Sequence, residues 1–244
     1  MRERADIAVV GAGAAGLAFA WAVAAPGLRV VVLEAGPGID QRAAPSLSPD
    51  WELALQTRFN ANPNLRRGPG DYPVDDSESE IRPAIFAAVG GSTIRWGAQF
   101  PRFRPSDFRM RTLDAVGRDW PLSYAELAPW YDLNDRMMGV SGLAGDPANP
   151  PRPERPCPPL PLCPATKALA AGFDRLGWHW WPSDAAILST GRAGREGCNQ
   201  CGPCGVGCPR HARASADIAY LGPARARGVE VRAGATVTAL RMGR

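Results

Sequence analysis

The stretch DIAVVGAGAAG, residues 6–16, decides the fold of this chain. Its first five residues form a short apolar run, which is typical of a buried β-strand. The pattern Gly-x-Gly-x-x-Gly follows at once, at Gly11, Gly13 and Gly16. A strand that runs directly into this glycine pattern predicts a sharp turn into a helix.

The sequence on the far side of the glycines completes the unit. Residues 17–25 are rich in alanine and predict a helix, which the dipeptide Pro26-Gly27 ends. Residues 29–33, RVVVL, predict a second strand that ends at Glu34. The chain therefore begins with a β-α-β unit, which predicts an α/β fold of the Rossmann type.

Each part of this unit has a role in binding a dinucleotide. Gly11 permits the tight turn, Gly13 lets a pyrophosphate approach the backbone, and Gly16 lets the helix pack closely on the strand. The helix N-terminus offers free N–H groups to the phosphates. Glu34 stands where a carboxylate accepts hydrogen bonds from ribose hydroxyls, which disfavours the 2′-phosphate of NADP. The predicted contacts here are Gly11, Gly13, Ala14, Ala15, Gly16, Glu34 and Ala35.

Residues 7–28 carry no charge and follow Arg2 and Arg4, as in a signal peptide or a membrane helix. The glycines, the proline and the alanine-rich composition oppose that interpretation, and the glycine spacing has the explanation given above. No other stretch approaches the length of a membrane span, so we predict no transmembrane segment.

Composition narrows the class of protein. The chain has 244 residues, of which 45% are hydrophobic and 21% charged, as in soluble globular proteins. Its net charge is +4, without a dense block of basic residues, so we predict no nucleic-acid partner.

Four further segments, in order along the chain, resemble the glucose–methanol–choline (GMC) family of FAD oxidoreductases. The first is GGSTIRWG at residues 90–97, and the second is WPLSYAEL at 120–127 with GVSG at 139–142. The third is CNQCGPCGVGCP at 198–209, and the fourth is GVEV at 228–231 with ATV at 235–237. Within the family, the chain is most similar to the bacterial gluconate, glucose, sorbitol and fructose dehydrogenases.

The resemblance implies FAD as the cofactor, and the segment LEAG at residues 33–36 is typical of FAD-binding chains. It places Gly90, Gly91, Ser92 and Thr93 beside the flavin or its pyrophosphate, and the backbone of Val237 near the adenine. The expected fold is a Rossmann-type FAD-binding domain with a mixed sheet and irregular proline-rich insertions. Family members are about twice as long, so we expect the carboxy-terminal substrate half to be absent.

The implied enzyme is an FAD-dependent dehydrogenase that acts on the CH–OH group of an alcohol, polyol or sugar. Hydride passes to the flavin, and the electrons pass on to a partner such as a haem or small electron-transfer subunit. The family's catalytic histidine lies in the absent half, and His179 and His211 do not stand in its motif, so no catalytic residue is assigned.

The alternatives are a flavin and iron–sulfur electron-transfer subunit and an inactive fragment. The compartment is not fixed: the cytoplasm is the default, whereas the branch resembled is often exported with a partner subunit.

A run of cysteines has the spacing C-x2-C-x2-C-x3-C-P of bacterial ferredoxins, at Cys198, Cys201, Cys204 and Cys208. This spacing makes the four thiols candidate ligands of an iron–sulfur cluster. Disulfides or structural thiols, a zinc site, and no site at all remain the alternatives. Cys157 and Cys163 are read as incidental or as a local disulfide.

Three domain segments follow from these patterns. Residues 1–112 are expected to form the first part of the FAD-binding core, 113–190 a helical and proline-rich insertion, and 191–244 the cysteine-rich loop and the return to the FAD-binding domain. In the insertion, Ser123-x-x-Glu126 is a capping box that predicts a helix to Gly139, with Pro129 breaking or restarting it. Leu169, Phe173 and Leu176 have helical spacing, with Gly177 as the stop.

Overall fold

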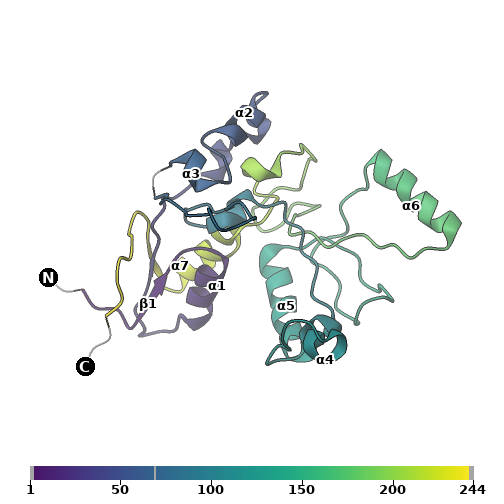
Figure 1. Ribbon diagram of the computed structural model, residues 1–244, viewed down its shortest axis with the longest axis horizontal. Helices are drawn as coiled ribbons and strands as arrows, with labels where there is room; N and C mark the ends of the chain where they lie inside the picture. The colour runs from purple at the N-terminus through teal and green to yellow at the C-terminus, as the bar shows by residue number, and fades with distance from the viewer. Residues whose placement is uncertain (1–2, 69, 242–244) are drawn as a thin grey trace. The chain divides into compact units, whose positions relative to one another are not determined.

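The computed structural model describes residues 3–68 and 70–241. The chain forms two compact units (Figure 1). Unit 1 comprises Met1–Gly97 with Asn199–Arg244, and unit 2 comprises Ala98–Cys198. The chain thus leaves unit 1 after residue 97 and returns to it at residue 199. The domain boundaries expected from the sequence were at 112/113 and 190/191.

Unit 1 is built on the predicted β-α-β unit. Strand β1 (Ile7–Val10) leads into helix α1 (Ala14–Val23), which is followed by strand β2 (Val30–Leu33). The strands are parallel, with Ile7 paired to Val30 and Val10 to Leu33. Because Val30–Val32 and the α1 residues Leu17 and Ala20 are buried, the helix and sheet share one apolar core.

A third strand comes from the other end of the chain. Strand β3 (Glu230–Arg232) pairs in parallel with β2, so the sheet has the order β1-β2-β3. All strand pairs among the described residues are parallel, where the sequence had suggested a mixed sheet. The Rossmann-type fold itself is confirmed.

A helical segment precedes β3 and packs on α1. It consists of a π-helical turn, η6 (Asp217–Leu221), that continues as helix α7 (Gly222–Ala226). Both contact α1, and the rings of Trp21 and Tyr220 meet edge to face at 5.8 Å. Figure 1 shows α7 next to α1.

The proline-rich segment between β2 and residue 90 has only short helices. Its elements are η1 (Gln41–Ala43), η2 (Pro45–Leu47), α2 (Trp51–Gln56) and α3 (Pro63–Arg66). An ion pair holds its second half, because Arg66 donates through Nε and Nη2 to Asp71 at 2.9 and 2.5 Å. Both side chains are buried, at 4% and 6% exposure. Two further 3-10 turns in unit 1 are η3 (Gly91–Arg95) and η5 (Cys204–Val206).

Unit 2 contains η4 (Pro105–Arg109) and the helices α4 (Met110–Asp114), α5 (Tyr124–Met138) and α6 (Pro164–Leu176). The capping box of α5 is formed: Ser123 Oγ accepts from the N–H of Glu126, and the Glu126 carboxylate accepts from the N–H of Ser123. Gly139 ends the helix in a left-handed conformation with φ +72°.

The prediction that Pro129 breaks α5 was wrong. The helix runs continuously from Tyr124 to Met138 with Pro129 inside it. Pro129 is the sixth residue of α5, so it removes one backbone hydrogen bond, the one that an N–H at this position would donate to the carbonyl of Ala125. The other turns of the helix form despite this loss. The strong cap at Ser123 supports the start of the helix.

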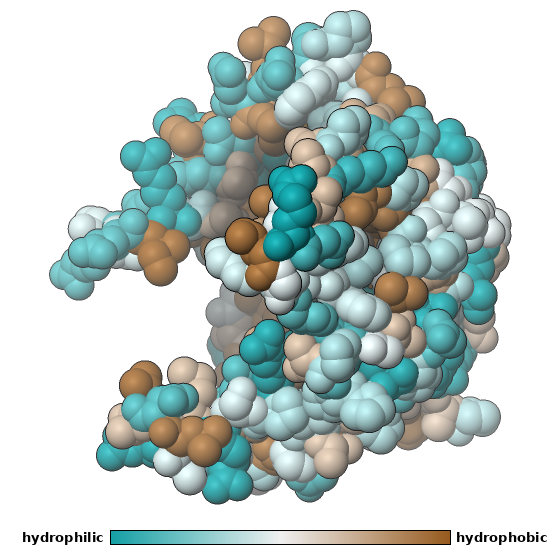
Figure 2. All heavy atoms as spheres, turned by 90° about the vertical axis from the view of Figure 1, so that its right-hand side faces the viewer, coloured by the Kyte–Doolittle hydropathy of each residue, from teal (hydrophilic) through white to brown (hydrophobic). Residues whose placement is uncertain are grey.

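Helix α6 confirms the predicted spacing, and Gly177 caps it at φ +67°. Only Ala170 of this helix is buried, whereas Leu169 and Leu176 are exposed. Figure 2 shows one face of the chain, on which hydrophobic residues are scattered among hydrophilic ones. Among the described residues, no helix has the length and apolar character needed to cross a membrane.

Candidate dinucleotide site

A cavity of about 900 Å³ lies in unit 1, at the carboxyl ends of β1 and β2. Ligands of parallel α/β folds bind at this edge of the sheet. The predicted site residues that line the cavity are Gly11, Gly13, Ala14, Glu34, Ala35, Gly91, Ser92, Thr93 and Val237. The fold therefore places nine of the predicted residues, from four separate segments, around one cavity.

The first glycine turn has the geometry expected from its sequence. Gly11 has φ +92°, and its N–H donates to the carbonyl of Leu33 at 2.8 Å. A Cβ on Gly13 would meet nothing within 4 Å, so the backbone there faces open space. A Cβ on Gly16 would lie 2.0 Å from the carbonyl oxygen of Gly11, which makes glycine necessary for the close packing of α1 on β1.

The carboxylate of Glu34 is buried, with 7% of the residue exposed, at the tip of β2. Its Oε2 accepts from the N–H of Ala12, and its Oε1 accepts from the N–H of Gly36, both at 2.8 Å. Glu34 thus ties the first glycine turn to the end of β2. Each carboxylate oxygen can accept more than one hydrogen bond, so these contacts leave capacity for a ribose hydroxyl.

The second glycine turn lies against the first. Gly90 has φ +110°, and its N–H donates to the carbonyl of Ala12 at 2.8 Å. Gly91 has φ +58°, and a Cβ there would lie 2.9 Å from the Cα of Gly13. The Thr93 hydroxyl donates to the carbonyl of Gly90 at 2.5 Å, which closes the turn on itself.

Three predicted contacts, Ala15, Gly16 and Gly90, are not among the residues that line the cavity. Gly16 faces the strand, as its contact with Gly11 shows. A Cβ on Gly90 would point to the carboxylate of Asp217, at 2.7 Å, so this glycine faces the protein interior. The roles of Gly16 and Gly90 are to let chain segments approach one another.

Several lining residues were not predicted, and the largest group comes from the irregular segment. The lining residues that were not predicted are Val10, Leu33, Gly70, Asp71, Tyr72, Ile85, Phe86, Ala87, Ala235 and Thr236. A Cβ on Gly70, which has φ +83°, would lie 2.7 Å from the Cα of Gly36, so the segment crosses directly over the end of β2. A lone glycine in a proline-rich loop gives no local signal of such a contact.

The residues present fit a dinucleotide such as FAD. The cavity volume lies within the roughly 300–1,000 Å³ of small-molecule and cofactor sites. Two glycine turns present backbone without side chains, and the N-terminus of α1, a helix of 10 residues, carries the positive end of the helix dipole. Apolar residues such as Phe86 and Val237 form much of the remaining wall.

Arginines lie behind this wall. The guanidinium of Arg95 lies over the rings of Phe59 and Phe86, at 4.9 and 5.2 Å from their centroids. Burial, together with the smaller effect of the charges of Arg66 and Arg213, lowers the pKa of Arg95 to about 10. The rear of the second glycine turn is therefore a region of positive charge.

The four cysteines of the run are not gathered into a ligand cluster. Cys198 ends unit 2, whereas Cys201, Cys204 and Cys208 belong to unit 1. In residues 3–68 and 70–241, no three histidine, cysteine or acidic side chains come together as a metal site. The iron–sulfur prediction gains no support from this arrangement.

None of the six cysteines, including Cys157 and Cys163, forms a disulfide within the described residues. The local disulfide suggested for Cys157 and Cys163 is not formed. Cys157 is buried with its thiol 3.8 Å from the Thr190 hydroxyl, and Cys163 is exposed beside Thr166. The two thiols thus belong to separate local contacts.

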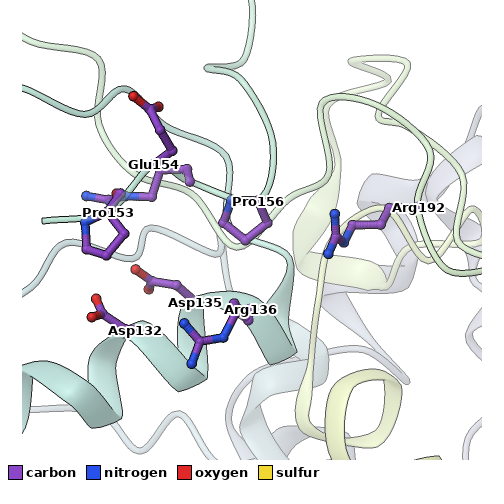
Figure 3. A pocket seen from close by; sticks show the side chains of 8 residues that line it. Asp132, Asp135, Arg136, Pro153, Glu154, Pro156 and Arg192 are labelled. Carbon is purple, nitrogen blue, oxygen red and sulfur yellow. The ribbon is translucent and has the colours of Figure 1, made fainter.

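A smaller cavity in unit 2, of about 190 Å³, has a different character (Figure 3). Asp132, Asp135 and Arg136 reach it from α5, and the proline-rich connector at 153–156 forms another side. Burial raises the pKa of Asp135, although Arg102 donates to its carboxylate and opposes that shift. This charged cavity lacks a glycine turn and is not a candidate dinucleotide site.

In unit 1, two glycine turns meet at the ends of parallel strands, and a buried acid closes the second strand. These features define a dinucleotide-binding domain of the Rossmann class. Residues 9–67 match the NAD(P)-binding Rossmann-like domain family.

Three known relatives are similar to this chain over much of its length. The chain is 36% identical over 197 residues to 2-methyl-1,2-propanediol dehydrogenase of Mycolicibacterium austroafricanum, covering 80% of this chain and 35% of the relative. It is 31% identical over 222 residues to 6'''-hydroxyparomomycin C oxidase of Streptomyces lividus, covering 89% of this chain and 38% of the relative. It is 31% identical over 159 residues to the fructose dehydrogenase large subunit of Gluconobacter japonicus, covering 57% of this chain and 28% of the relative.

Among solved structures, pyridoxine 4-oxidase from Mesorbium loti superposes with a TM-score of 0.54 at 21% identity, covering 95% of this chain and 42% of that one. At this identity the match supports the fold. The chain is homologous to the amino-terminal, FAD-binding region of GMC-type oxidoreductases. It spans about a third of the length of the relatives compared, 35% and 38% for the first two.

Proposed function

We propose that the cavity of unit 1 binds FAD and that the chain serves an oxidoreductase acting on the CH–OH group of a small alcohol, polyol or sugar. The observation that carries the proposal is the meeting of Gly13, Glu34 and Gly91 at one cavity. The homology to alcohol and sugar oxidoreductases supports the same class of reaction.

Each group in the cavity has a task in this proposal. The backbone at Gly13 and the N-terminus of α1 hold the pyrophosphate, and Glu34 accepts from the ribose. Ser92 and Thr93 border the cavity from the second glycine turn, and Val237 borders it from the segment after β3. Bound FAD supplies the hydride acceptor.

No residue of this chain is assigned as the catalytic base. His179 Nε2 lies 2.8 Å from the carboxylate of Asp146 in unit 2, and His211 belongs to unit 1. Neither histidine lines the cavity of unit 1. We propose that substrate chemistry requires residues from beyond this chain, as the share of its relatives that it covers suggests.

The first experiment measures FAD binding by the chain as it stands. Purified protein is titrated with FAD, and flavin fluorescence, absorbance and retention on gel filtration are recorded. Saturable binding of one FAD per chain supports the proposal, and the variant Gly13→Val, which fills the open space in front of the backbone, is expected to abolish it. No binding by correctly folded protein overturns the FAD assignment.

A second experiment addresses the reaction. Flavin-loaded protein is mixed with alcohols, polyols and sugars, and flavin bleaching is followed without oxygen. Bleaching by one class of donor assigns that class. Bleaching by an added reduced electron carrier, without a response to any donor, is expected if substrate chemistry requires residues from beyond this chain, and it is also expected of the alternative electron-transfer subunit. No bleaching by either favours an inactive fragment.

We propose a partner subunit as the electron acceptor, because one relative is named as the large subunit of fructose dehydrogenase. This also motivates the finer placement in the gluconate, glucose and sorbitol dehydrogenase branch.

Iron and acid-labile sulfide, measured after anaerobic purification, test whether Cys198, Cys201, Cys204 and Cys208 hold a cluster. Absence of both removes the cluster and leaves the FAD proposal intact.

A further inference from the structure

Arg213 is the largest fully buried side chain in the described chain, with 1% of the residue exposed. It follows the cysteine run and lies behind the second glycine turn. Its Nη1 donates to the carbonyl of Thr93 at 2.6 Å, and its Nη2 donates to the carbonyl of Ile94 at 2.7 Å. One guanidinium thus holds two successive carbonyls of η3.

Gln41 completes the arrangement from another segment. Its side-chain oxygen accepts from Arg213 Nη2 at 3.1 Å, and its Nε2 donates to Ser215 Oγ and to Asp217 Oδ2 at 2.8 and 2.7 Å. Gln41 has 2% exposure, so these bonds form away from water, where each lost partner is costly.

The segment that carries Arg213 adds further bonds to the same turn. The N–H of Ala216 donates to the Thr93 hydroxyl at 2.9 Å, and Trp96 Nε1 donates to the carbonyl of Ala214 at 2.8 Å. Asp217 lies directly behind Gly90, where a Cβ would meet its carboxylate at 2.7 Å. The turn is therefore held from behind by residues 213–217.

The front of the turn borders the cavity. Gly91, Ser92 and Thr93 line it, and the Gly90 N–H is held by the first glycine turn. Thr93 connects the two sides of the turn. It borders the cavity, and its carbonyl and hydroxyl accept hydrogen bonds from Arg213 and Ala216 on the opposite side. A carbonyl held by a guanidinium cannot rotate without breaking a charge-assisted hydrogen bond.

We propose that Arg213, held by Gln41, is a positioning residue that sets the second glycine turn in the shape required to bind the cofactor. Arg213 does not line the cavity, so its effect on the cofactor passes through Thr93 and Ile94. Only arginine presents a planar fork that reaches two carbonyls at once, whereas lysine is a single point of charge. This inference rests on the proposed FAD site.

The test compares FAD affinity with stability in three variants of the full chain. Arg213→Gln removes the fork, Arg213→Lys keeps the charge, and Gln41→Leu removes the support. The control is Arg155→Gln, because Arg155 is also buried and also donates to a carbonyl, that of Pro153, but belongs to unit 2. Thermal unfolding without FAD, the dissociation constant of FAD and the visible circular dichroism of bound flavin are measured on each protein.

Arg213→Gln is expected to raise the FAD dissociation constant at least about tenfold, the equivalent of one lost charge-assisted hydrogen bond, and to change the flavin dichroism. Arg213→Lys is expected to recover part of the affinity, and Gln41→Leu to weaken it less. Arg155→Gln is expected to lower the unfolding temperature and leave the FAD affinity unchanged.

The inference is overturned if folded Arg213→Gln binds FAD as the parent does, or if Arg155→Gln weakens binding equally. If Arg213→Gln does not fold, Arg213→Lys and Gln41→Leu decide, and parental affinity and dichroism in both overturn it. Failure of the parent chain to bind FAD is a different result, which rejects the proposed function before the variants are compared.

Discussion

A Cβ atom added to Gly91 would lie 2.9 Å from the Cα of Gly13, so the two glycine turns of unit 1 touch through backbone alone. Real Cβ atoms essentially never come so close to another carbon atom, so a side chain at residue 91 must separate the turns. The contact joins segments almost eighty residues apart at the mouth of the cavity. The position of one turn therefore depends on the other.

Gly91→Ala is expected to weaken FAD binding by about tenfold or more. The added methyl group separates the turns, and the left-handed backbone at φ +58° adds strain of order 1 kcal/mol for a residue other than glycine. Gly38→Ala is the matched control, because a Cβ at residue 38 would meet nothing within 4 Å. Titration with FAD followed by fluorescence measures both variants, and equal affinities would contradict the prediction.

Glu34→Gln is expected to destabilise unit 1 by roughly 1–3 kcal/mol and to weaken FAD binding, because an amide replaces one of two buried acceptor oxygens. The NH2 group would then face the N–H of either Ala12 or Gly36. Urea unfolding and FAD titration measure the two effects. Glu78→Gln, at an exposed glutamate, serves as the control, and a Glu34 variant as stable as this control would show that the carboxylate is dispensable.

The local parts of this site could be predicted from sequence. The strand, the glycine spacing and Glu34 lie within thirty residues, and their geometry follows from the backbone itself. Among the long-range parts, Gly91, Ser92, Thr93 and Val237 were predicted through the family resemblance, and all four line the cavity. The other long-range contacts could not be predicted. The pairing of β2 with β3 joins Val31 to Glu230, and the bridge from Gln41 to Arg213 spans 172 positions. Such contacts depend on how the segments pack, and the sequence around each of these residues contains no local pattern that predicts its partner.

Asp71→Asn is expected to loosen the segment that crosses the cavity. Asp71 accepts from Arg66 and from the N–H of Gly68, and breaking a buried ion pair by removing one partner costs about 3–5 kcal/mol. FAD should then dissociate faster, because Asp71 and Tyr72 border its proposed site. Stopped-flow release of FAD and limited proteolysis within residues 60–85 measure the change, with Asp76→Asn as the control. Unchanged release and cleavage rates would show that the ion pair does not hold the segment.

The pH dependence of stability can be traced to Glu3, whose carboxylate accepts from Arg232 and Arg29. The hydrogen bond from Arg232, and then that from Arg29, lowers the pKa of Glu3 from 4.5 to about 2. A carboxylate whose pKa is lowered on folding stabilises the fold at pH values above its unfolded pKa. Its contribution is lost as the pH falls from 4.5 through about 2.

Glu3→Gln should therefore be less stable than the parent above pH 4.5, and this difference should shrink as the pH falls towards 2. Thermal unfolding of both proteins across this range measures the difference. Because these side chains are substantially exposed, the effect should be small and should decrease further in 1 M salt, where screening extends to about 3 Å. Glu52→Gln, at another exposed glutamate, controls for the loss of a charge alone. A difference that is independent of pH, or that grows on acidification, would show that the arginines do not stabilise the ionised form of Glu3.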